Sequence, residues 1–510
     1  MPRALAVLAA VLVILPSAAQ ARSELPLGSP SLSETRTTDR LAPGAVYTKI
    51  VRGKLSTRDG WTVDVAIVAD RPAARDLARR LREAGFDAEV QRLERAPDDP
   101  ARGPLAFRVH SGLFATRQQS DERLAAIRAA GFTARGSVFT AEDGERTTGP
   151  WVVHVLDIDP ERYRGRIEPA LATDVVVDRE KLSMLSARRG ALAAINGGYF
   201  VIGEADGTPG DLAGSSILDG QLISEAVDGR TDLVLSEGEA PSVTAISDVQ
   251  SVTASDGATR VLDGVNRKPG LIRACGGTGG DSPTELPLHD ITCTDPSELI
   301  HSRPIFGAAT QAGEGVEALL DATGTVTALR EPRGGAILPG SSVLTGTGDA
   351  ADWLRAHAQP GSAVTIATSV STEDGHLALA SSLGVVNGGP RLLRGGRPDI
   401  TARAEGFDRP GDRAFYYAFA LRRNPRTIAG VTSDGRLLLV AVDGRAPGYS
   451  AGLDFEEEAD VMRALGARDA VNLDGGGSTT MTIRGSVVTR PSDATGERPI
   501  GDAILLLPGG

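Results

Sequence analysis

The chain has 510 residues, of which 41% are hydrophobic, and this is enough for two or three domains with cores of their own. Its formal net charge of −12 argues against a broad nucleic-acid-binding surface. Glycine is abundant (61 residues), aromatic residues make up only 4%, and short Val, Ile and Leu runs alternate with glycine-containing turns. This composition favours a strand-rich globular protein over a helical bundle.

The first 21 residues have the pattern of a secretory signal peptide. Arg3 precedes an apolar run over residues 4–15, and the small residues Ala19 and Ala21 mark a cleavage site after Ala21. The alternative is an uncleaved anchor, but the apolar run is short for a membrane span. We therefore expect a secreted or cell-wall-associated protein with no membrane span after cleavage. Residues 22–44 are polar, and we expect a linker there, with a first strand as the alternative for its end.

An internal repeat follows the linker. Residues 61–90 and 105–136 each combine an alternating strand, an amphipathic helix that ends at Ala-Gly-Phe, and a second strand. The apolar residues at helical spacing are Ala74, Ala78 and Leu81 in the first copy and Leu124 and Ile127 in the second. Gly85 and Gly131 stand where a helix is usually terminated by glycine. Two such βαβ units predict a small four-stranded sheet with two helices on one face.

Residues 61–140 resemble the sporulation-related repeat (SPOR) domain, and the second copy, "FRVHSGLFATRQQSDERLAAIRAAGF", carries most of that likeness. The resemblance implies that this segment binds the glycan strands of peptidoglycan. The alternative is a ferredoxin-like spacer without a ligand.

Residues 148–510 are predicted to form one strand-rich domain. Asp-Gly pairs between alternating apolar residues, as in "ILDGQLIS" and "TSDGRLLLVAVDGR", indicate β-hairpins. The clearest helix is "DFEEEADVMRALG", with Asp454 as N-cap, Glu457 three residues later and Gly466 at its end. The expected fold class is α+β, with a strand-rich mixed-sheet domain beside the small βαββαβ, ferredoxin-like domain.

Three segments of this domain share one pattern, in which an apolar strand stops at Asn or Asp and two glycines follow. They are "AAINGGYF", "GVVNGGP" and "VNLDGGGSTT". Such a strand presents its polar side chain at a sheet edge, and the glycines let a ligand approach the backbone. Three such turns in one domain indicate a shared site, although each alone would be an ordinary turn. The candidate substrate-binding residues are Asn196, Gly197, Asn387, Gly388, Gly475, Gly476, Gly477, Ser478 and Thr479.

Several common chemistries are missing from the sequence. The glycine run has neither the spacing nor the lysine of a nucleotide P-loop, although its backbone N–H groups could bind an anion. Ser478 is not in a GxSxG elbow, and the chain has only six histidines and no HxH or HExxH motif. The sequence therefore predicts no defined metal site and no certain cofactor, while calcium at the Asp-Gly turns stays open.

Carboxylate, amide and arginine chemistry is what remains. Arg426 follows Pro425 at the start of a strand, where its guanidinium could bind phosphate bidentately. Asp443 ends the following strand in a second Asp-Gly pair, for which a plain turn is the alternative.

The chain has two cysteines, Cys275 and Cys293. In an exported protein we expect a disulfide between them. The enclosed loop contains acidic residues and one histidine, so zinc binding is the weaker alternative.

Taken together, the motifs resemble those of the phosphodiester glycosidase family. The matching segments are "INGGYF", "VVNGGPRLLRGG", "NPRTIAGV", "LVAVDGR" and "VNLDGGGSTT", in the order of the family. "APGAVYTKI" at residues 42–50 is similar to the opening strand of the family, so residues 42–58 could join the domain and make the SPOR-like repeat an insertion. The loop between the cysteines is not part of the family pattern.

The resemblance implies hydrolysis of the C1–O bond of a sugar-1-phosphodiester, a carbohydrate substrate. It suggests Asp474 as base or nucleophile near C1, Asp443 as the second acidic group, Arg426 with Gly475–Ser478 on the phosphate, and Asn196 and Asn387 on sugar hydroxyls. A substrate in a cell-wall glycosyl phosphate polymer would suit the SPOR-like repeat. The alternatives are a peptidoglycan-binding wall protein with an inert C-terminal domain, and a phosphodiesterase or ordinary glycosidase acting on a wall polymer.

Overall fold

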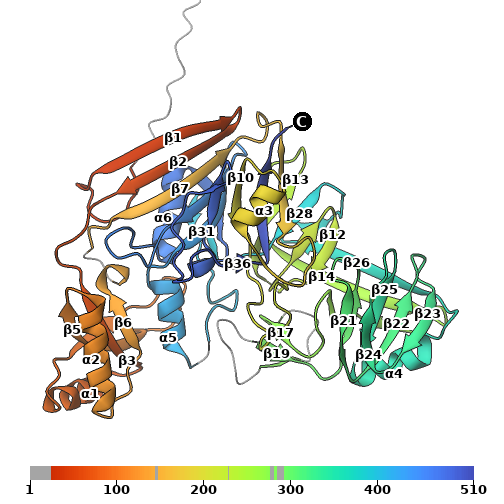
Figure 1. The fold of residues 1–510 in the computed structure, drawn as a ribbon, viewed down its shortest axis with the longest axis horizontal. Coiled ribbons are helices and arrows are strands. Elements are labelled where there is room, and N and C mark those ends of the chain that lie inside the picture. Colours follow the sequence, from red (N-terminus) through yellow and green to blue (C-terminus); the bar gives the residue numbers. More distant parts are fainter. Residues whose placement is uncertain are drawn as a thin grey trace, which may run out of the picture.

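The computed structural model describes residues 24–143, 147–227, 229–275, 281–283, 292–409 and 411–509. The predicted signal peptide and most of the loop between the two cysteines lie outside these residues. No helix within the described ranges is long and apolar enough to cross a membrane. Figure 1 shows a small domain (orange), central sheets, and a further strand-rich region (green) on the far side from the small domain.

The small domain has the predicted βαββαβ order. Its elements are β3 (Trp61–Val68), α1 (Arg71–Glu83), β4 (Glu89–Leu93), β5 (Ala106–Phe114), α2 (Arg117–Ala129) and β6 (Gly136–Phe139). The sheet order is β4-β5-β3-β6. Helix α1 begins at Asp70, whose carboxylate accepts the N–H of Ala73, and buries Ala74, Ala78 and Leu81 against the sheet. Gly85 and Gly131 have φ of 87°, which confirms the predicted glycine helix ends.

The largest central sheet joins strands from both sides of the small domain in the sequence. Its strands, in spatial order, are β1 (Glu34–Ala42), β2 (Ala45–Arg52), β7 (Trp151–Ile158), β32 (Leu437–Val442), β31 (Arg426–Thr432), β33 (Ala467–Asn472), β29 (Arg391–Arg394) and β30 (Arg397–Pro398). Strand β2 precedes the small domain and pairs antiparallel with β7, which follows it. The small domain is therefore inserted between two neighbouring strands of this sheet.

Strand β1 occupies part of the segment for which we expected a linker. Its residues are polar because β1 is the edge strand, pairing with β2 alone and half-exposed along its length. Leu25 and Leu27, which precede it, are fully buried. A polar edge strand has no apolar alternation, so the sequence pattern resembles that of a linker.

A second, five-stranded sheet packs on the first. It consists of β35 (Ser486–Val487), β34 (Met481–Ile483), β10 (Ala193–Asn196), β37 (Asp502–Leu507) and β8 (Arg166–Leu171). Leu156 and Val471 of the first sheet share a core with Ile195 and Ile504 of the second. The helix α3 (Leu182–Arg188) and the pair β9 (Glu180–Lys181) with β36 (Pro499–Ile500) adjoin it.

A third sheet leads into the green region of Figure 1. Its strands are β12 (Gln221–Ser224), β11 (Ser216–Leu218), β28 (Leu383–Val386), β13 (Thr231–Ser236), β14 (Ser242–Ala254), β26 (Val364–Thr372) and β27 (Gly375–Leu377), with β15 (Thr259–Val261) on β14. Beyond it lie β16 (Gly264–Val265), β20 (Leu299–Ser302), β25 (Ser342–Gly346), β22 (Val316–Leu320) and β23 (Val326–Arg330), with α4 (Gly348–His357) and the pair β21 (Ala309–Gly313) and β24 (Arg333–Ala336). Among the described strands the pairings are antiparallel, apart from β16 with β20.

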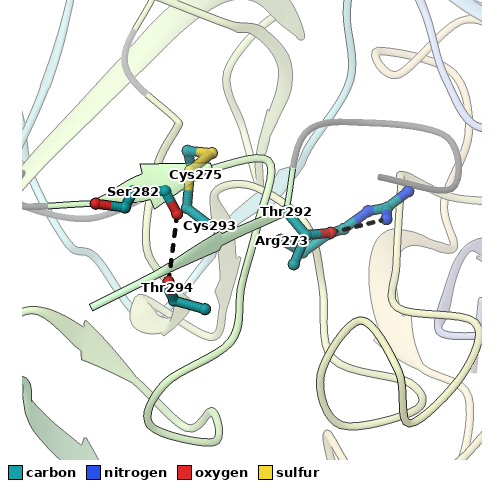
Figure 2. The surroundings of a disulfide bond; sticks show 6 residues. All are labelled: Arg273, Cys275, Ser282, Thr292, Cys293 and Thr294. Atoms are coloured by element: carbon teal, nitrogen blue, oxygen red, sulfur yellow. Dashed lines mark hydrogen bonds between the residues drawn. A yellow bond between two sulfur atoms is a disulfide. The ribbon is translucent and has the colours of Figure 1, made fainter. Parts of the chain in front are cut away.

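The predicted disulfide is present between Cys275 and Cys293, whose Cα atoms are 5.1 Å apart. It lies in a small sheet of β17 (Ile272–Arg273), β19 (Thr292–Thr294) and β18 (Ser282–Pro283), where Thr294 donates to the carbonyl oxygen of Ser282 (Figure 2).

Helices on the side of the first sheet nearest the small domain complete the core. Helix α6 (Phe455–Leu465) has the predicted capping box between Asp454 and Glu457, and ends at Gly466 with φ of 99°. It covers β29 and β33. The short helix α5 (Arg413–Tyr416) continues into the π-helix η2 (Tyr417–Leu421) and lies beside the small domain.

Candidate active site

The segment "VNLDGGGSTT" forms the connection from β33 to β34, and its glycines fold into the 3-10 turn η3 (Gly476–Ser478). Asp474, Gly475 and Gly476 are half-buried, whereas Ser478 and Thr479 are almost fully buried. The accessible part of this loop is therefore Asp474 to Gly476. Ser478 and Thr479 contact protein beneath it, which does not agree with their predicted contact with substrate.

Asn196 holds this loop onto the end of β10. Its side-chain amide donates to the carbonyl oxygen of Asp474 (2.7 Å). Its side-chain oxygen accepts from the hydroxyl of Thr427 (2.8 Å) and from the N–H of Thr480 (3.1 Å). Asn196 is 1% exposed, and its side-chain oxygen and amide both bond protein groups. Its predicted contact with sugar hydroxyls stays a prediction.

Asn387 has a similar structural role at the end of β28. Its side-chain oxygen accepts the N–H of Tyr199 (2.8 Å), and its amide donates to the carbonyl oxygen of the same residue (3.3 Å). The hydroxyl of Tyr199 in turn accepts from Asn472 (2.7 Å) and donates to Gly389 (2.8 Å). This network joins the three Asn/Asp-Gly-Gly segments, as the sequence pattern predicted, but through buried bonds that exclude Asn387 from a substrate surface.

Gly197 and Gly198 are required because other side chains press on them. A Cβ at Gly197 would lie 2.5 Å from Asp502 Oδ1, and one at Gly198 would lie 2.5 Å from the side-chain amide of Asn387. Gly388 is packed likewise against the backbone of Asn472. The absence of a side chain at these three glycines lets the neighbouring segments contact each other, and the space beside each glycine is filled by protein atoms.

Asp502, at the start of β37, is the second carboxyl group beside the loop. Burial raises its pKa to about 7, the N–H of Gly198 (2.9 Å) lowers it, and the negative charge of Asp474 raises it further. Asp474 and Asp502 thus form an acidic pair of unequal environment, one half-exposed and one buried. Nothing in the sequence around Asp502 signals this, because the pairing joins β37 to a loop 28 residues earlier in the chain.

Arg426 lies beside the loop through the stem of its side chain, since its Cδ is 3.8 Å from where a Cβ of Gly475 would stand, but its guanidinium is bound by protein groups. Its guanidinium pairs with the buried carboxylate of Glu458 (2.9 Å), donates to the carbonyl oxygens of Leu453 (2.9 Å) and Phe419 (2.7 Å), and stacks over Phe455. It is 2% exposed, and its predicted role on a phosphate stays a prediction.

Arg445 and Arg498 also lie beside the glycine loop. The exposed Arg445 donates to the side-chain oxygen of Asn424 (2.8 and 3.2 Å), and its Nη1 is 3.4 Å from where a Cβ of Gly476 would stand. Arg498 pairs bidentately with Asp493 (2.8 and 3.0 Å), and a side chain at Gly477 would collide with that pair. The sequence could have indicated Arg445, because it belongs to the Asp-Gly-Arg motif, whereas Arg498 is not part of any recognised motif.

Asp443, the first residue of the Asp-Gly-Arg motif, is buried. Its carboxylate bonds the imidazole of His154 (3.1 Å) and accepts the N–H of Arg490 (2.7 Å), and it is 1% exposed. His154 continues to the hydroxyl of Tyr47 (2.8 Å). Asp443 therefore anchors the turn that carries Arg445, and its role as the second acid stays a prediction.

The backbone amides of the loop are partly occupied. The N–H of Gly476 donates to Pro425 (2.9 Å), and that of Ser478 to Gly475 (3.1 Å). The predicted anion nest of successive free amides is therefore not formed, and the guanidinium groups supply the positive charge.

Two other observations bear on ligands. In the described part of the chain, no group of three or more His, Cys, Asp and Glu side chains is arranged to hold a metal ion. A surface pocket lined by Glu314, Arg333 and Arg355 belongs to the region of β22, β25 and α4, not to the Asp474 loop.

Comparisons with known proteins agree with the motifs. A family model described as phosphodiester glycosidase matches residues 314–507, and one described as SPOR domain matches residues 57–135. The N-acetylglucosamine-1-phosphodiester alpha-N-acetylglucosaminidase of Mus musculus is 32% identical over 103 residues, which are 20% of this chain and 20% of that protein. The Bos taurus enzyme of the same name is 37% identical over 68 residues, covering 13% of this chain and 12% of that protein.

A crystal structure of a Burkholderia pseudomallei protein, whose description gives no activity, is similar over nearly the whole molecule. It is 34% identical, with a TM-score of 0.86 over 95% of this chain and 98% of that one. The matches to the named enzymes cover a fifth or less of their length, and the range of the family model, residues 314–507, includes Asp474, Arg445 and Arg498. The similarity to the phosphodiester glycosidase family therefore covers residues 314–507, and that to the SPOR domain covers residues 57–135.

Proposed function

We propose that the protein is a hydrolase that cleaves the sugar C1–O bond of a sugar-1-phosphodiester. The observation that carries the proposal is the placement of a half-buried carboxylate, Asp474, on the same short loop as Gly476 and Gly477, which Arg445 and Arg498 adjoin. The Asp474 carboxylate and two guanidinium groups, one of them paired with Asp493, suit a substrate with an electrophilic carbon and an anionic leaving group. The family match supports the same reaction class.

The chemistry needs no strong acid at the leaving oxygen. Water adds to C1 and loses a proton, while the electrons of the C1–O bond pass to the phosphate oxygen, which departs as a phosphomonoester. A phosphomonoester has a second pKa of about 6, so it leaves far more readily than a sugar alkoxide. In this proposal Arg445 and Arg498 stabilise the phosphate charge that develops. Asp474 either takes the proton from water or attacks C1 first, and Asp502 beneath it sets the charge of the pair.

The position of bond cleavage tests the reaction directly. The protein is incubated in ¹⁸O-labelled water with a panel of sugar-1-phosphodiesters, and the products are weighed by mass spectrometry. We expect an unlabelled phosphomonoester together with the free reducing sugar, and the phosphomonoester decides the result because the C1 oxygen of a free sugar exchanges with water. Label in phosphate, with free alcohol and a sugar 1-phosphate as products, would establish P–O cleavage and a phosphodiesterase instead.

Substitution of the carboxylate tests the residue assignment. We expect Asp474→Asn to lower kcat by at least about 100-fold, the scale of acid–base catalysis, with unchanged thermal unfolding. Asp219→Asn, in the turn between β11 and β12, is the matched control and should keep full activity. An Asp474→Asn protein with wild-type turnover would remove the central role of this loop.

For the natural substrate we propose a glycosyl phosphate polymer attached to peptidoglycan, reached by an exported protein. The presence of a SPOR domain in the same chain supports this proposal. The sheet face of that domain turned away from α1 and α2 is buried, because Ala106 and Phe139 share a core with Trp151 and Tyr416 of the larger domain. A glycan strand would then meet the exposed helices and the sheet edges.

Sedimentation with insoluble peptidoglycan tests this wall association. We expect the intact protein to co-sediment, and the double charge reversal Arg71→Glu with Arg75→Glu, on the exposed face of α1, to weaken binding several-fold. Equal sedimentation with peptidoglycan and with an unrelated insoluble polysaccharide such as cellulose would contradict the proposal, whatever the result for hydrolysis.

A further inference from the structure

The SPOR domain is packed against the phosphodiester glycosidase domain along an extended polar interface. The hydroxyl of Tyr416 and the N–H of Arg403 both donate to Asp98 (3.1 Å each), and Arg403 also pairs with Asp99 (3.0 Å). Arg413 donates to the carbonyl oxygen of Leu105 (2.7 Å). Together with the shared apolar core, these contacts fix the SPOR domain in one orientation and distinguish it from a module on a flexible tether.

The interface ends at the turn η1 (Thr140–Glu142), where the chain leaves the small domain. The carboxylate of Glu142 pairs with Arg422, and its carbonyl oxygen accepts the N–H of Arg423 (2.9 Å). The guanidinium of Arg423 also donates to the carbonyl oxygen of Ala141 (3.1 Å). Glu142 is 7% exposed, so this is a buried clamp between the two domains.

The clamped segment reaches the candidate active site within two residues. Asn424 follows Arg423 and accepts both hydrogen bonds from the Arg445 guanidinium. The amide of Asn424 is itself bound to the carbonyl oxygens of Ala418 and Arg422 (2.9 Å each), so its orientation depends on the clamped segment. Pro425 then accepts the N–H of Gly476 in the glycine loop (2.9 Å).

Glu142 and the arginines around it also interact electrostatically with Arg445. Arg445 has an exposed surface, but desolvation by the surrounding protein lowers the pKa of its guanidinium; the charge of Glu142 raises this pKa, while the guanidinium groups of Arg422, Arg426 and Arg498 lower it. Glu142 is therefore the acidic group that offsets the repulsion of Arg445 by the surrounding arginines. A neutral group at position 142 would leave Arg422 unpaired beside Arg445.

We propose that the turn η1, through which the chain leaves the SPOR domain, is a positioning element of the active site, in which Glu142 holds residues 422–425 so that Asn424 presents Arg445 to the glycine loop. Glu142 is a positioning residue, because it acts through Asn424 and Arg445 and does not itself touch substrate. The inference rests on the proposed function for the part that Arg445 plays in hydrolysis. The mechanical linkage itself is independent of which reaction the site performs.

A double-mutant cycle separates positioning from general destabilisation. The full chain, Glu142→Gln, Arg445→Ala and the double variant are assayed with the methyl diester of N-acetylglucosamine 1-phosphate, which is too small to need glycan binding. We expect Glu142→Gln to lower kcat/KM by about tenfold in the wild-type background, the upper range for residues that act through a network, and by less than about twofold in the Arg445→Ala background. Equal losses in both backgrounds would overturn the proposal, because the effect would then not pass through Arg445.

Asp98→Asn is the matched control at the same interface. It removes a carboxylate that contacts Arg403 and Tyr416 and does not touch residues 422–425. We expect it to lower the unfolding temperature as Glu142→Gln does, but to reduce kcat/KM by less than about twofold. A loss equal to that of Glu142→Gln would show that any weakening of the interface reduces activity, and would also overturn the specific role of Glu142.

Hydrogen exchange tests the structural link between Glu142 and Arg445 independently of catalytic activity. Deuterium uptake is compared by mass spectrometry in peptides covering residues 443–453 and 472–481. Faster uptake in Glu142→Gln than in Asp98→Asn, with β8 and β37 unchanged, is the expected result. Unchanged uptake in both peptides would contradict the linkage. If no diester were hydrolysed by the wild-type protein, the proposed function would fail while this measurement still decided the linkage.

Discussion

Two arginines near the site show how the same side chain serves different purposes. Arg426 is enclosed with Glu458 and Phe455, so its charge is balanced inside the core. Arg445 is exposed and is held from one side by Asn424, which leaves its guanidinium beside Gly476. The first arrangement contributes to stability, and the second suits binding of an anion.

This difference predicts opposite effects of substitution. Arg445→Ala should lower kcat/KM by about 100-fold, the scale reported for removal of one transition-state donor, with little change in unfolding. Arg426→Ala should instead cost about 3–5 kcal/mol of unfolding free energy, because Glu458 would be left buried without its partner. Urea unfolding and steady-state kinetics on both variants check the pair. A stable Arg426→Ala protein with selective loss of activity would reverse the two roles.

Asp502 predicts a pH dependence of stability. Burial raises its pKa to about 7 in the folded protein, whereas an unfolded aspartate has a pKa of about 3.9. Between about pH 4 and 7 the folded state keeps a proton that the unfolded state releases, so the contribution of this group to stability falls as pH rises through that window and is constant above it. In Asp502→Asn this loss is absent.

The measurement is the difference in unfolding free energy between wild type and Asp502→Asn. From pH 5 to pH 8 we expect it to shift against the wild type by on the order of 2 kcal/mol. Other buried carboxyl groups are present in both proteins and cancel in the difference. A constant difference across this range would show that Asp502 titrates normally.

At the scale of elements, α6 is specified almost entirely by local residues. Its capping box begins the helix, and Gly466 with φ of 99° ends it. We predict that Gly466→Ala costs about 1–2 kcal/mol in thermal or urea unfolding, because Ala is strained in this left-handed conformation. Gly136→Ala, where φ is not positive and a Cβ would meet no atom within 4 Å, should change stability by less than about 0.5 kcal/mol. Equal effects of both changes would remove the backbone explanation.

The sequence predicts the elements that local residues specify, and it does not predict features that depend on contacts between distant segments. The repeat helices and α6 carry their caps and apolar spacing within a dozen residues, so pattern alone locates them. The edge strand β1 lacks an apolar face and was interpreted as linker. The site depends on contacts between distant segments, such as Asp502 with Gly198 and Arg498 with the glycine loop, and these leave no local signature. Asn196 and Asn387 were predicted to share one substrate site; the structure joins their segments through hydrogen bonds, and the burial of both side chains is a property of the folded chain that no local pattern predicts.

For the whole molecule, the shared core implies that the two domains unfold together. Leu105 and Phe139 of the SPOR domain lie in one apolar cluster with Trp151 and Tyr417 of the larger domain. Separation of the domains would expose this cluster to water, at a cost of about 25 cal/mol per Å² of apolar surface. The linked segments before β3 and after β6 also return to adjacent strands, β2 and β7, so the SPOR domain cannot leave without disturbing both ends of its insertion.

Calorimetry of the full chain tests this cooperativity. We expect one transition, and Leu105→Ala, at a position 1% exposed, should lower it by an amount equivalent to about 2–5 kcal/mol while keeping it single. Leu113→Ala, at a position 63% exposed on β5, the strand that follows Leu105, is the control and should leave the transition almost unchanged. Two resolved transitions, with only the earlier one shifted by Leu105→Ala, would show that the SPOR domain melts independently. Its contacts with Arg403 and Arg422 would then be too weak to hold residues 422–425 in place, and the link from Glu142 to Arg445 would lose its mechanical basis.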